Sequence, residues 1–363
     1  MVMEMDFLMQ QGANHNQSPR PVASPANAEN NQCGRFGSPV QSQTRSGINE
    51  PAKMNNPNQL QCHPAAPAER IQAFKNVFEV WRHADTLEDH LTKRLASPQH
   101  SRAEWFVGCL GERVVVSLGC YPMQFILRGD LVKGIAIGAV HTVPDCRGHG
   151  YAAALLSWVE EYQAELGAEI SLLFSDIDPR YYARLGYTLC PSTEGWVDAQ
   201  RGPTRQAERL SLIRFSPEQD LVRLMKIYTD HHSGLPLFVG RDEDYWSYLF
   251  RKEARLEFYW VTSKSEPRGY VSLSAAGRRW SLKDWAVEES LLPDTMAAIL
   301  KAAREAGAEQ VGGWMPDTPP FRENFRLEPR TRELTMIKFL DQERKVDRRL
   351  QEAAGGLRAI DHV

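Results

Sequence analysis

Apolar residues recur at three- and four-residue spacing between Ile71 and Trp81. This spacing places them on one face of a helix. A short strand at residues 59–62 is expected before this helix. Asp85 and Glu88 fit a capping box ahead of a second apolar helical face, which Pro98 closes. Two helices are therefore predicted before the main strands. The first helical face consists of Ile71, Phe74, Val77, Phe78 and Trp81.

Longer apolar runs separated by glycine turns follow the two helices and predict three strands. Gly111 and Gly129 mark the turns, and Pro122 inside the second run predicts a bulge or an edge position. An amphipathic helix then ends at Gly167, and a buried strand is expected at Ile170 to Phe174. Two helices followed by an antiparallel meander indicate an α+β fold. The three strands are expected at Trp105 to Leu110, Arg113 to Leu127 and Leu131 to Val143.

The second half of the chain repeats this plan. A strand at Leu212 to Phe215 precedes two helical stretches, one after Pro217 and one that contains Tyr245 to Phe250. Three strands and a helix from Pro293 to Ala306 follow, and Leu334 to Phe339 closes the copy. We therefore expect two tandem domains, each a mixed and largely antiparallel sheet flanked by helices. The three strands of the second copy are Phe258 to Thr262, Gly269 to Ala275 and Leu282 to Val287.

These patterns divide the chain into four parts. Residues 1–57 are rich in Asn, Gln, Ser and Pro and cannot bury enough apolar surface to offset the entropy of ordering, which predicts a disordered tail. The first copy of the plan spans residues 58–200 and the second spans residues 208–340. A charged helix and tail are expected at residues 341–363.

Charge and cysteine content exclude some classes of partner and site. The formal net charge is −3, which gives no reason to expect nucleic acid or an anionic membrane as a partner. No window approaches about 18 uninterrupted apolar residues, so no membrane span is expected. The six cysteines form no C-x-x-C pair and no metal-like spacing with the ten histidines. Free thiols in a reducing cytoplasm, without a bound metal, are the expectation.

The stretch from Val140 to Ala152 carries the candidate chemistry. An apolar strand ends near Thr142, and residues 147–150, Arg-Gly-His-Gly, supply a turn that can curl because glycine tolerates positive φ. A helix starts at once, so its first backbone amides lack intrahelical acceptors and the positive end of the helix dipole points into the turn. Such a turn is a site for phosphate.

The segment from about residue 59 to residue 195 resembles the GCN5-related N-acetyltransferase (GNAT) family, in which an R/Q-x-x-G-x-G/A loop binds the pyrophosphate of acetyl-CoA. Here the loop stands as Arg147-Gly148-His149-Gly150-Tyr151-Ala152. The flanking residues 139–144 and 181–187 look most like the tandem-domain branch named for enhanced intracellular survival. That branch carries a third, sterol-carrier-like domain, and no such domain is expected after residue 340, which puts the branch's hexameric assembly and aminoglycoside chemistry in doubt.

The resemblance implies acetyl-CoA as the co-substrate and assigns roles to particular residues. Tyr182 matches the family position whose phenol protonates the CoA thiolate. A phenol with a pKa near 10 is a workable acid for a thiol with a pKa near 8.5. For Tyr181 a structural role is the better hypothesis. The residues expected to hold acetyl-CoA are Val140, His141, Thr142, Arg147, Gly148, His149, Gly150, Tyr151 and Ala152.

The sequence leaves the general base open. Many members of the family place a carboxylate on the strand before the loop, but residues 134–140 contain none. His141 is the nearest titratable side chain, although strand alternation can point it away from the cleft. Asp176 and Asp178 are alternatives after the next strand. The branch that the chain resembles uses a C-terminal carboxylate, and whether that of Val363 reaches the cleft is also open.

The second copy lacks the loop. At the corresponding position it has Glu288 and Glu289 and no glycine, and carboxylates there would repel a pyrophosphate. This degenerate copy is therefore not expected to bind CoA. It is expected to wall off part of the acceptor cleft or to carry a homo-oligomer interface.

The sequence thus predicts a cytoplasmic acetyl-CoA-dependent N-acetyltransferase. The acetyl group would pass directly to a small-molecule primary amine or a lysine side chain in a ternary complex, without a metal. The competing hypothesis is a non-catalytic acyl-CoA-binding or assembly module with the same fold, which the missing strand carboxylate favours.

Overall fold

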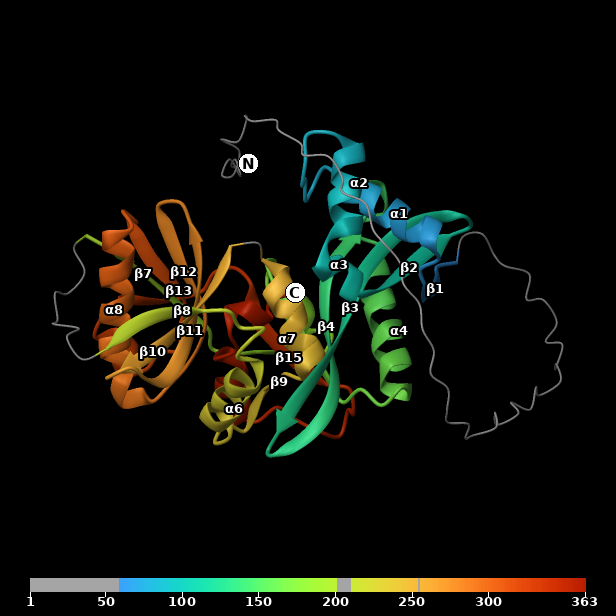
Figure 1. Cartoon of the computed structure of the whole chain (residues 1–363). Coiled ribbons are helices and arrows are strands. Elements are labelled where there is room, and N and C mark those ends of the chain that lie inside the picture. The colour runs from blue at the N-terminus through green and yellow to red at the C-terminus, as the bar shows by residue number, and fades with distance from the viewer. Residues whose placement is uncertain (1–58, 201–209, 254) are drawn as a thin grey trace, which may run out of the picture. The chain divides into compact units, whose positions relative to one another are not determined.

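The computed structural model describes residues 59–200, 210–253 and 255–363, and the tail predicted at residues 1–57 lies outside this part of the chain. The described residues form two sheets, one of eight strands and one of seven, each flanked by helices (Figure 1). The α+β architecture and its mixed, largely antiparallel sheets are therefore confirmed.

The first sheet is antiparallel from β1 to β4 and becomes parallel between β4 and β5. Helices α1 (Pro67–Asn76), α2 (Leu87–Ala96) and α3 (Pro98–Arg102) precede its main strands, and α4 (Tyr151–Glu165) and α5 (Arg180–Ala183) come later. The strand order is β1 (Gln61–Pro64), β2 (Glu104–Leu110), β3 (Arg113–Leu127), β4 (Asp130–Thr142), β5 (Ile170–Ser175), β15 (Leu334–Phe339) and β6 (Thr188–Leu189), with β9 (Leu237–Gly240) also paired to β3.

The second sheet has the same kind of order, with one parallel pair between β12 and β13. Its helices include α6 (Leu221–His232), α7 (Glu243–Lys252), α8 (Leu292–Glu305) and α9 (Pro319–Arg322), and α10 (Arg348–Gly355) follows the last strand of the chain. The strand order is β14 (Leu327–Pro329), β7 (Thr193–Asp198), β13 (Gln310–Trp314), β12 (Arg279–Val287), β11 (Glu266–Ala276), β10 (Leu256–Ser263) and β8 (Ser211–Phe215).

The two sheets exchange strands along the sequence. β7 precedes residue 200 but pairs with β13 in the second sheet, whereas β15 closes the second copy in sequence but lies between β5 and β6 in the first sheet. β9 also crosses over and pairs with β3. The boundary expected between residues 200 and 208 therefore divides the sequence and does not divide the sheets.

We expect that a fragment of residues 58–200 will not fold by itself, because it lacks β15. In the whole chain β15 pairs with β5 from Leu334↔Ser175 to Phe339↔Ile170, and Met336 and Ile337 are buried. Without β15, this edge of β5 would lose its ladder and its apolar cover. The measurement is a thermal melt followed by near-ultraviolet circular dichroism, with residues 59–363 as the reference. A cooperative transition in the fragment of residues 58–200 would show that it folds without β15 and would contradict this prediction.

Amphipathic helices cover the sheets as their spacing predicts. In α8 the buried positions Leu292, Met296, Ile299, Leu300 and Ala303 follow helical spacing, and the helix covers one face of the second sheet (Figure 1). Burying each large aliphatic side chain stabilises the fold by about 1.5–3 kcal/mol relative to leaving it exposed. Helix α8 therefore packs on and stabilises the second sheet, although the loop before it differs from the corresponding loop of the first copy.

Two local expectations were only partly right. The cap of α2 is Thr86, whose hydroxyl accepts a hydrogen bond from the Asp89 amide at 3.1 Å, so the predicted cap at Asp85 was one residue early. Pro122 sits between the part of β3 that pairs with β2, which ends at Cys120, and the part that pairs with β9, which begins at Gln124. A residue without an amide hydrogen is tolerated in this gap because no ladder bond is required on this side of β3, whereas on the other side Pro122 is paired with Ile135 of β4.

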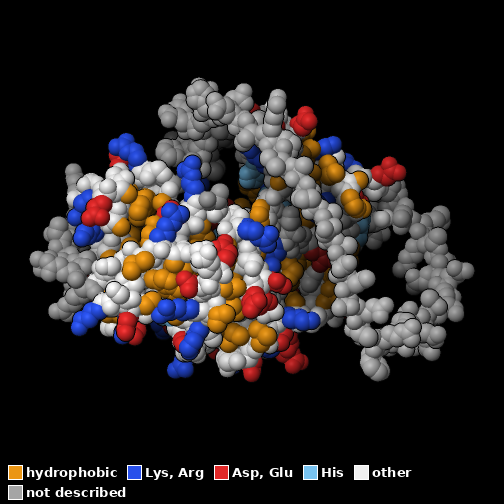
Figure 2. Space-filling view, viewed as in Figure 1, with side chains coloured by type: hydrophobic (Ala, Val, Ile, Leu, Met, Phe, Trp, Pro, Cys, Tyr) orange, Lys and Arg blue, Asp and Glu red, His pale blue; other side chains and the backbone are white. Residues whose placement is uncertain are grey.

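The face of the molecule drawn in Figure 2 carries both positive and negative side chains. In Figure 2, Lys and Arg side chains are interspersed with Asp and Glu side chains over the visible face, in keeping with a net charge of −3. None of the described helices has the length and apolar character needed to cross a membrane.

Candidate active site

The parallel strands β4 and β5 part at one end, and a cavity of about 450 Å³ opens between them. Their pairing runs from Gly134↔Ile170 to Ile137↔Leu173 and stops there. The cavity is lined by Trp81, His83, Arg94, Gln99, His100, Ile137, Gly138, Ala139, Val140, Thr142, Ala152, Leu173, Phe174, Ser175, Asp176, Ile177, Tyr181, Tyr182, His362 and Val363.

A β-bulge in β4 lies at this parting. Ser117 pairs with His141, but Gly119 pairs with Gly138, so two residues of β4 stand opposite one residue of β3. One of the two, Ala139, has a φ of 51°, which is uncommon for a residue with a Cβ. Bulges interrupt the backbone ladder and occur next to active sites. The bulge thus turns the end of β4 into the cavity wall.

The predicted phosphate loop has the geometry that its glycines require. Gly148 and Gly150 have φ of 81° and 79°, and a Cβ on either residue would meet no atom within 4 Å. Glycine is therefore needed for the left-handed backbone and not for lack of space. Gly150 is the N-cap of α4. Within the described residues, the amides of residues 148–153 donate to no acceptor, so they are free to bind an anion.

The other loop residues support this turn from the side. The Arg147 side chain is exposed and its Nε donates to the carbonyl of Thr142 at 3.1 Å. His149 Nδ1 lies 3.3 Å from the carbonyl oxygen of Cys146, and its ring stacks on that of Tyr151. Ala152, in the first turn of α4, lines the cavity. The loop and the cavity are therefore contiguous.

Tyr182 lies on α5 and faces the cavity. Its side chain is buried against Tyr181 and Tyr187, and its hydroxyl makes no hydrogen bond to any described residue. Burial raises the pKa of Tyr182 to about 12, with smaller contributions from Tyr181 and from the charge of Asp176. The phenol therefore stays protonated at neutral pH, but the pKa gap to a CoA thiol is wider than a phenol at pKa 10 would give.

His141 does not line the cavity, unlike its neighbours Val140 and Thr142. It is buried, its Nε2 has no hydrogen-bond partner within the described residues, and desolvation followed by the charge of Arg147 lowers its pKa. Strand alternation places it behind the cavity wall. The structure therefore places His141 outside the cavity lining, next to two residues that belong to it.

The two aspartates after β5 differ. Asp176 lines the cavity, and its Oδ1 accepts a hydrogen bond from the Glu333 amide at 3.0 Å. Asp178 is exposed and paired with Arg180, whose hydrogen bonds and charge lower the pKa of Asp178 to about 2. Asp176 therefore lines the cavity, as does Val363, whereas Asp178 does not.

Sequence reasoning missed most of the far wall of the cavity, although the family resemblance had left open whether Val363 reaches the cleft, and Val363 does line it. Trp81, His83 and His100 come from the region of the first helices, and His362 and Val363 come from the end of the sequence. His83 stacks on His90, and desolvation followed by the charge of Arg94 lowers its pKa, so its imidazole is neutral at pH 7. Helical periodicity assigned Trp81 to a core face, but nothing in the local pattern brings residue 363 to residue 138.

In the described residues, the second copy lacks the loop that precedes α4 in the first copy. After β12, the 3₁₀ turn η2 (Glu289–Leu291) leads directly into α8, and Glu288 pairs with Arg268 at 3.4 Å. In the first copy, η1 (Pro144–Cys146) is followed by four loop residues before α4. Within the part of the chain that the structure describes, the second copy thus has no counterpart of residues 147–150, whose backbone would bind a phosphate in the first copy.

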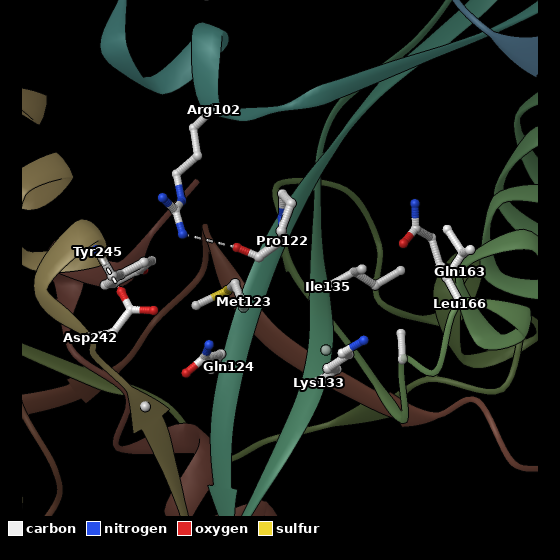
Figure 3. Close-up of a pocket in the computed structure, with 13 residues that line it drawn as sticks. Arg102, Pro122, Met123, Gln124, Lys133, Ile135, Gln163, Leu166, Asp242 and Tyr245 are labelled. Atoms are coloured by element: carbon white, nitrogen blue, oxygen red, sulfur yellow. Dashed lines mark hydrogen bonds between the residues drawn. The ribbon is translucent and has the colours of Figure 1, made fainter. Parts of the chain in front are cut away.

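Two other features lie outside this site. A cavity of about 340 Å³ beside β3 and β4 is lined by Arg102, Lys133, Asp242 and Tyr245, among others (Figure 3), and includes none of the predicted site residues. His63, Glu69 and Cys109 also bring potential metal ligands within 4.8 Å of one another. Glu69 accepts a hydrogen bond from the amide of Ala66 and pairs with His63, which accounts for this group without a metal.

Comparisons with known proteins bear on the fold of the chain. Residues 61–190 match the family model described as an acetyltransferase (GNAT) domain, whereas none of the curated proteins matches the chain. A GCN5-related N-acetyltransferase from Kribbella flavida has 16% sequence identity and a TM-score of 0.61, over 78% of this chain and 72% of that chain.

Two further solved structures have the same fold. A protein from Enterococcus faecalis V583 described as a probable N-acyltransferase has 16% identity and a TM-score of 0.63, over 78% of this chain and 73% of that chain. Eis1 from Mycobacterium abscessus has 18% identity and a TM-score of 0.53, over 78% and 74%. Residues 61–190 therefore form a GNAT domain, in a chain that has the fold of GNAT acetyltransferases.

Proposed function

We propose that this chain is an acetyl-CoA-dependent N-acetyltransferase that acts on a primary amine by direct transfer in a ternary complex. One observation carries the proposal. Two left-handed glycines, Gly148 and Gly150, expose the amides at the start of α4, and the same helix end opens into a cavity that contains Tyr182. A phosphate site beside a protonated phenol is the arrangement that a CoA thioester requires.

The donor would be held by backbone at both ends. The pyrophosphate would take the amides of residues 148–152 and the positive end of the α4 dipole, and Arg147 would add charge. The pantetheine would run along the end of β4 at Val140 and Thr142, both of which line the cavity. The thioester would then lie at the bulge around Ala139. Fixing the donor in this way removes translational and rotational entropy from the barrier.

Proton transfer would use two groups that line the cavity, Tyr182 and Asp176. As the amine nitrogen bonds to the acetyl carbon and the C–S bond breaks, Tyr182, with a pKa of about 12, would give its proton to the departing thiolate, which leaves as the CoA thiol. The phenol would then regain a proton from solvent. Asp176 lies close enough to Tyr182 for its charge to raise the phenol pKa, and it would attract the ammonium of the acceptor and take its proton. The neutral imidazole of His83 is the second candidate for the base.

Asp176→Asn should lower kcat by about 10²-fold, within the usual range for a general base, and should leave acetyl-CoA affinity unchanged. Asp178→Asn is the matched control, because Asp178 is exposed and already paired with Arg180. Initial rates at saturating acetyl-CoA, measured across pH, test the assignment. Equal rates in the two variants would transfer the role to His83.

The direct test of function follows CoA thiol release from acetyl-CoA by the purified protein. The acceptor panel contains polyamines, aminoglycosides and lysyl peptides, and mass spectrometry identifies the acetylated amine. The proposal expects thiol release that depends on one acceptor class and equals product formed. Thermal stabilisation by acetyl-CoA with no thiol release from any acceptor would instead favour a non-catalytic acyl-CoA-binding module.

A further inference from the structure

The second sheet repeats the parting of strands that creates the cavity in the first sheet. β12 and β13 pair in parallel from Arg279↔Gln310 to Leu282↔Gly313, and the pairing then stops. The corresponding place in the first sheet, beyond Ile137↔Leu173, is where the proposed acetyl-CoA cavity opens. Because the two sheets share this arrangement of a parallel strand pair, a second cleft would be expected just beyond the last pair of β12 and β13, at Asp284 and Trp285.

The end of the chain lies in this second parting, beside a cavity of about 320 Å³ that is lined by Ser281, Lys283, Gly313 and Trp314, among others. Arg358 stacks on the Trp285 ring, with its Cζ 3.6 Å from the ring centroid, and its Nε lies 3.8 Å from Asp284 Oδ1. Asp361, in η3 (Ala359–Asp361), accepts two hydrogen bonds from Arg241 at 3.1 and 2.6 Å. Arg241 also donates to Asp284 at 2.6 Å. We refer to residues 358–363 as the C-terminal segment.

The charges that hold this segment are withdrawn from solvent. The side chains of Arg241 and Asp284 are 0% exposed, and that of Asp361 is 1% exposed. Tyr270 donates a further hydrogen bond to Asp284 at 2.7 Å. Two arginines thus face two aspartates, and Arg241 donates to both carboxylates, whereas Asp284 Oδ1 and Arg358 Nε have no hydrogen-bond partner among the described residues. Removing Arg241 would leave the two buried carboxylates uncompensated.

The tip of the segment crosses from the second sheet to the first. Lys252 Nζ donates to the carbonyl of Ile360 at 2.8 Å and also to that of His362. The His362 ring lies between Phe174 of β5 and Trp314 of β13, with ring centroids 4.9 and 5.7 Å away. Val363 packs over Gly138, where a Cβ would lie 3.5 Å from Val363 Cγ2. Figure 1 marks this end of the chain beside α7 and β4.

We propose that the second copy has exchanged a CoA cleft for a holder of the C-terminal segment, and that Arg241 and Lys252 are positioning residues that place His362 and Val363 in the acetyl-transfer cavity. The inference rests on the proposed function of that cavity. It explains why a copy without a phosphate loop keeps the parallel pair β12 and β13. The role of the second copy is to shape the acceptor end of the first copy's site.

The test uses Lys252→Met in the full chain, because removing Arg241 would leave buried aspartates without a partner and could prevent folding. Lys252→Met removes two hydrogen bonds to the segment without leaving a buried charge. Lys283→Met is the matched control, since Lys283 loses the same charge nearby but pairs with Glu253. Lys252→Arg keeps a donor for the carbonyls and should restore activity in part.

Two measurements separate positioning from general stability. Hydrogen–deuterium exchange of residues 358–363 should rise in Lys252→Met and stay at the wild-type level in Lys283→Met. For the acceptor amine, kcat/KM should fall between about tenfold and a hundredfold, as expected for a misplaced wall of a reactive site, while acetyl-CoA affinity stays unchanged. Unchanged kcat/KM together with raised exchange would overturn the proposal, as would rapid exchange of this segment in the wild-type protein.

The exchange measurement does not depend on catalysis. If the wild-type protein transfers no acetyl group, the proposed function fails. The holder is then judged by exchange alone: protection that is lost in Lys252→Met and kept in Lys283→Met supports it, and equal exchange in the two variants contradicts it.

Discussion

Gly150→Asp is expected to reduce acetyl-CoA affinity by at least a hundredfold while leaving the fold intact. The residue has a φ of 79° and open space at the Cβ position, and Asp is among the residues that tolerate this backbone region. Its carboxylate would face the pyrophosphate, and each unit charge at 4 Å costs about 4 kcal/mol at an effective dielectric constant of 20. Isothermal titration calorimetry with acetyl-CoA measures the loss.

The other end of the same helix supplies the control. Gly167 has a φ of 90° and equally open space, just beyond the C-terminal end of α4. An aspartate there opposes the helix dipole and should cost about 0.3–1 kcal/mol of stability, whereas one at Gly150 favours the dipole. Gly167→Asp should therefore be the less stable variant but should bind acetyl-CoA normally. Gly150→Asp should be the more stable variant but should not bind acetyl-CoA. Wild-type affinity in Gly150→Asp would remove the phosphate loop from residues 147–152.

Tyr182→Phe should lower kcat by about 10² to 10⁴-fold, the range for loss of an acid catalyst, with acetyl-CoA affinity unchanged. The ring keeps its packing against Tyr181 and Tyr187, so only the hydroxyl is lost. Tyr181→Phe is the control, because Tyr181 lines the same cavity but has no assigned proton to give. Steady-state kinetics at saturating acetyl-CoA compare the two variants, and a normal kcat in Tyr182→Phe would return Tyr182 to a structural role.

The pH profile gives an independent check on Tyr182. Burial raises the phenol pKa from 10 to about 12, so the hydroxyl keeps its proton below that pH and loses it above. The wild-type rate should therefore show no decline from phenol ionisation up to about pH 10, where an unperturbed tyrosine would already be half ionised. A descending limb near pH 10 that disappears in Tyr182→Phe would mean that the phenol is not desolvated.

The phosphate loop could be predicted from the sequence because it is formed by residues that are contiguous in the chain. The glycines at 148 and 150 and the start of α4 follow from a strand, a turn and an apolar periodicity, and the structure gives both glycines the positive φ that the turn requires. Tyr182 was assigned because it matches a position of the GNAT family, and it lines the cavity. The predicted loss of the loop in the second copy agrees with the direct passage from η2 into α8.

Long-range features could not be predicted in this way. Strand alternation indicated that His141 could point away from the cleft. Which side chains of β4 reach the cavity also depends on the bulge at Ala139, which the sequence pattern does not reveal. The exchange of β7 and β15 between sheets leaves no trace in periodicity, since a strand has the same pattern in either sheet. Val363 reaches Gly138 because Arg241 and Asp361 bind each other across 120 residues of sequence.

The most direct test of the account is the number of acetyl-CoA molecules bound per chain, measured by native mass spectrometry at saturating acetyl-CoA. The loop at residues 147–152 and the lack of such a loop in the described residues of the second copy predict one molecule on the wild-type chain and none on Gly150→Asp. Two molecules on the wild-type chain, or one retained on Gly150→Asp, would contradict it.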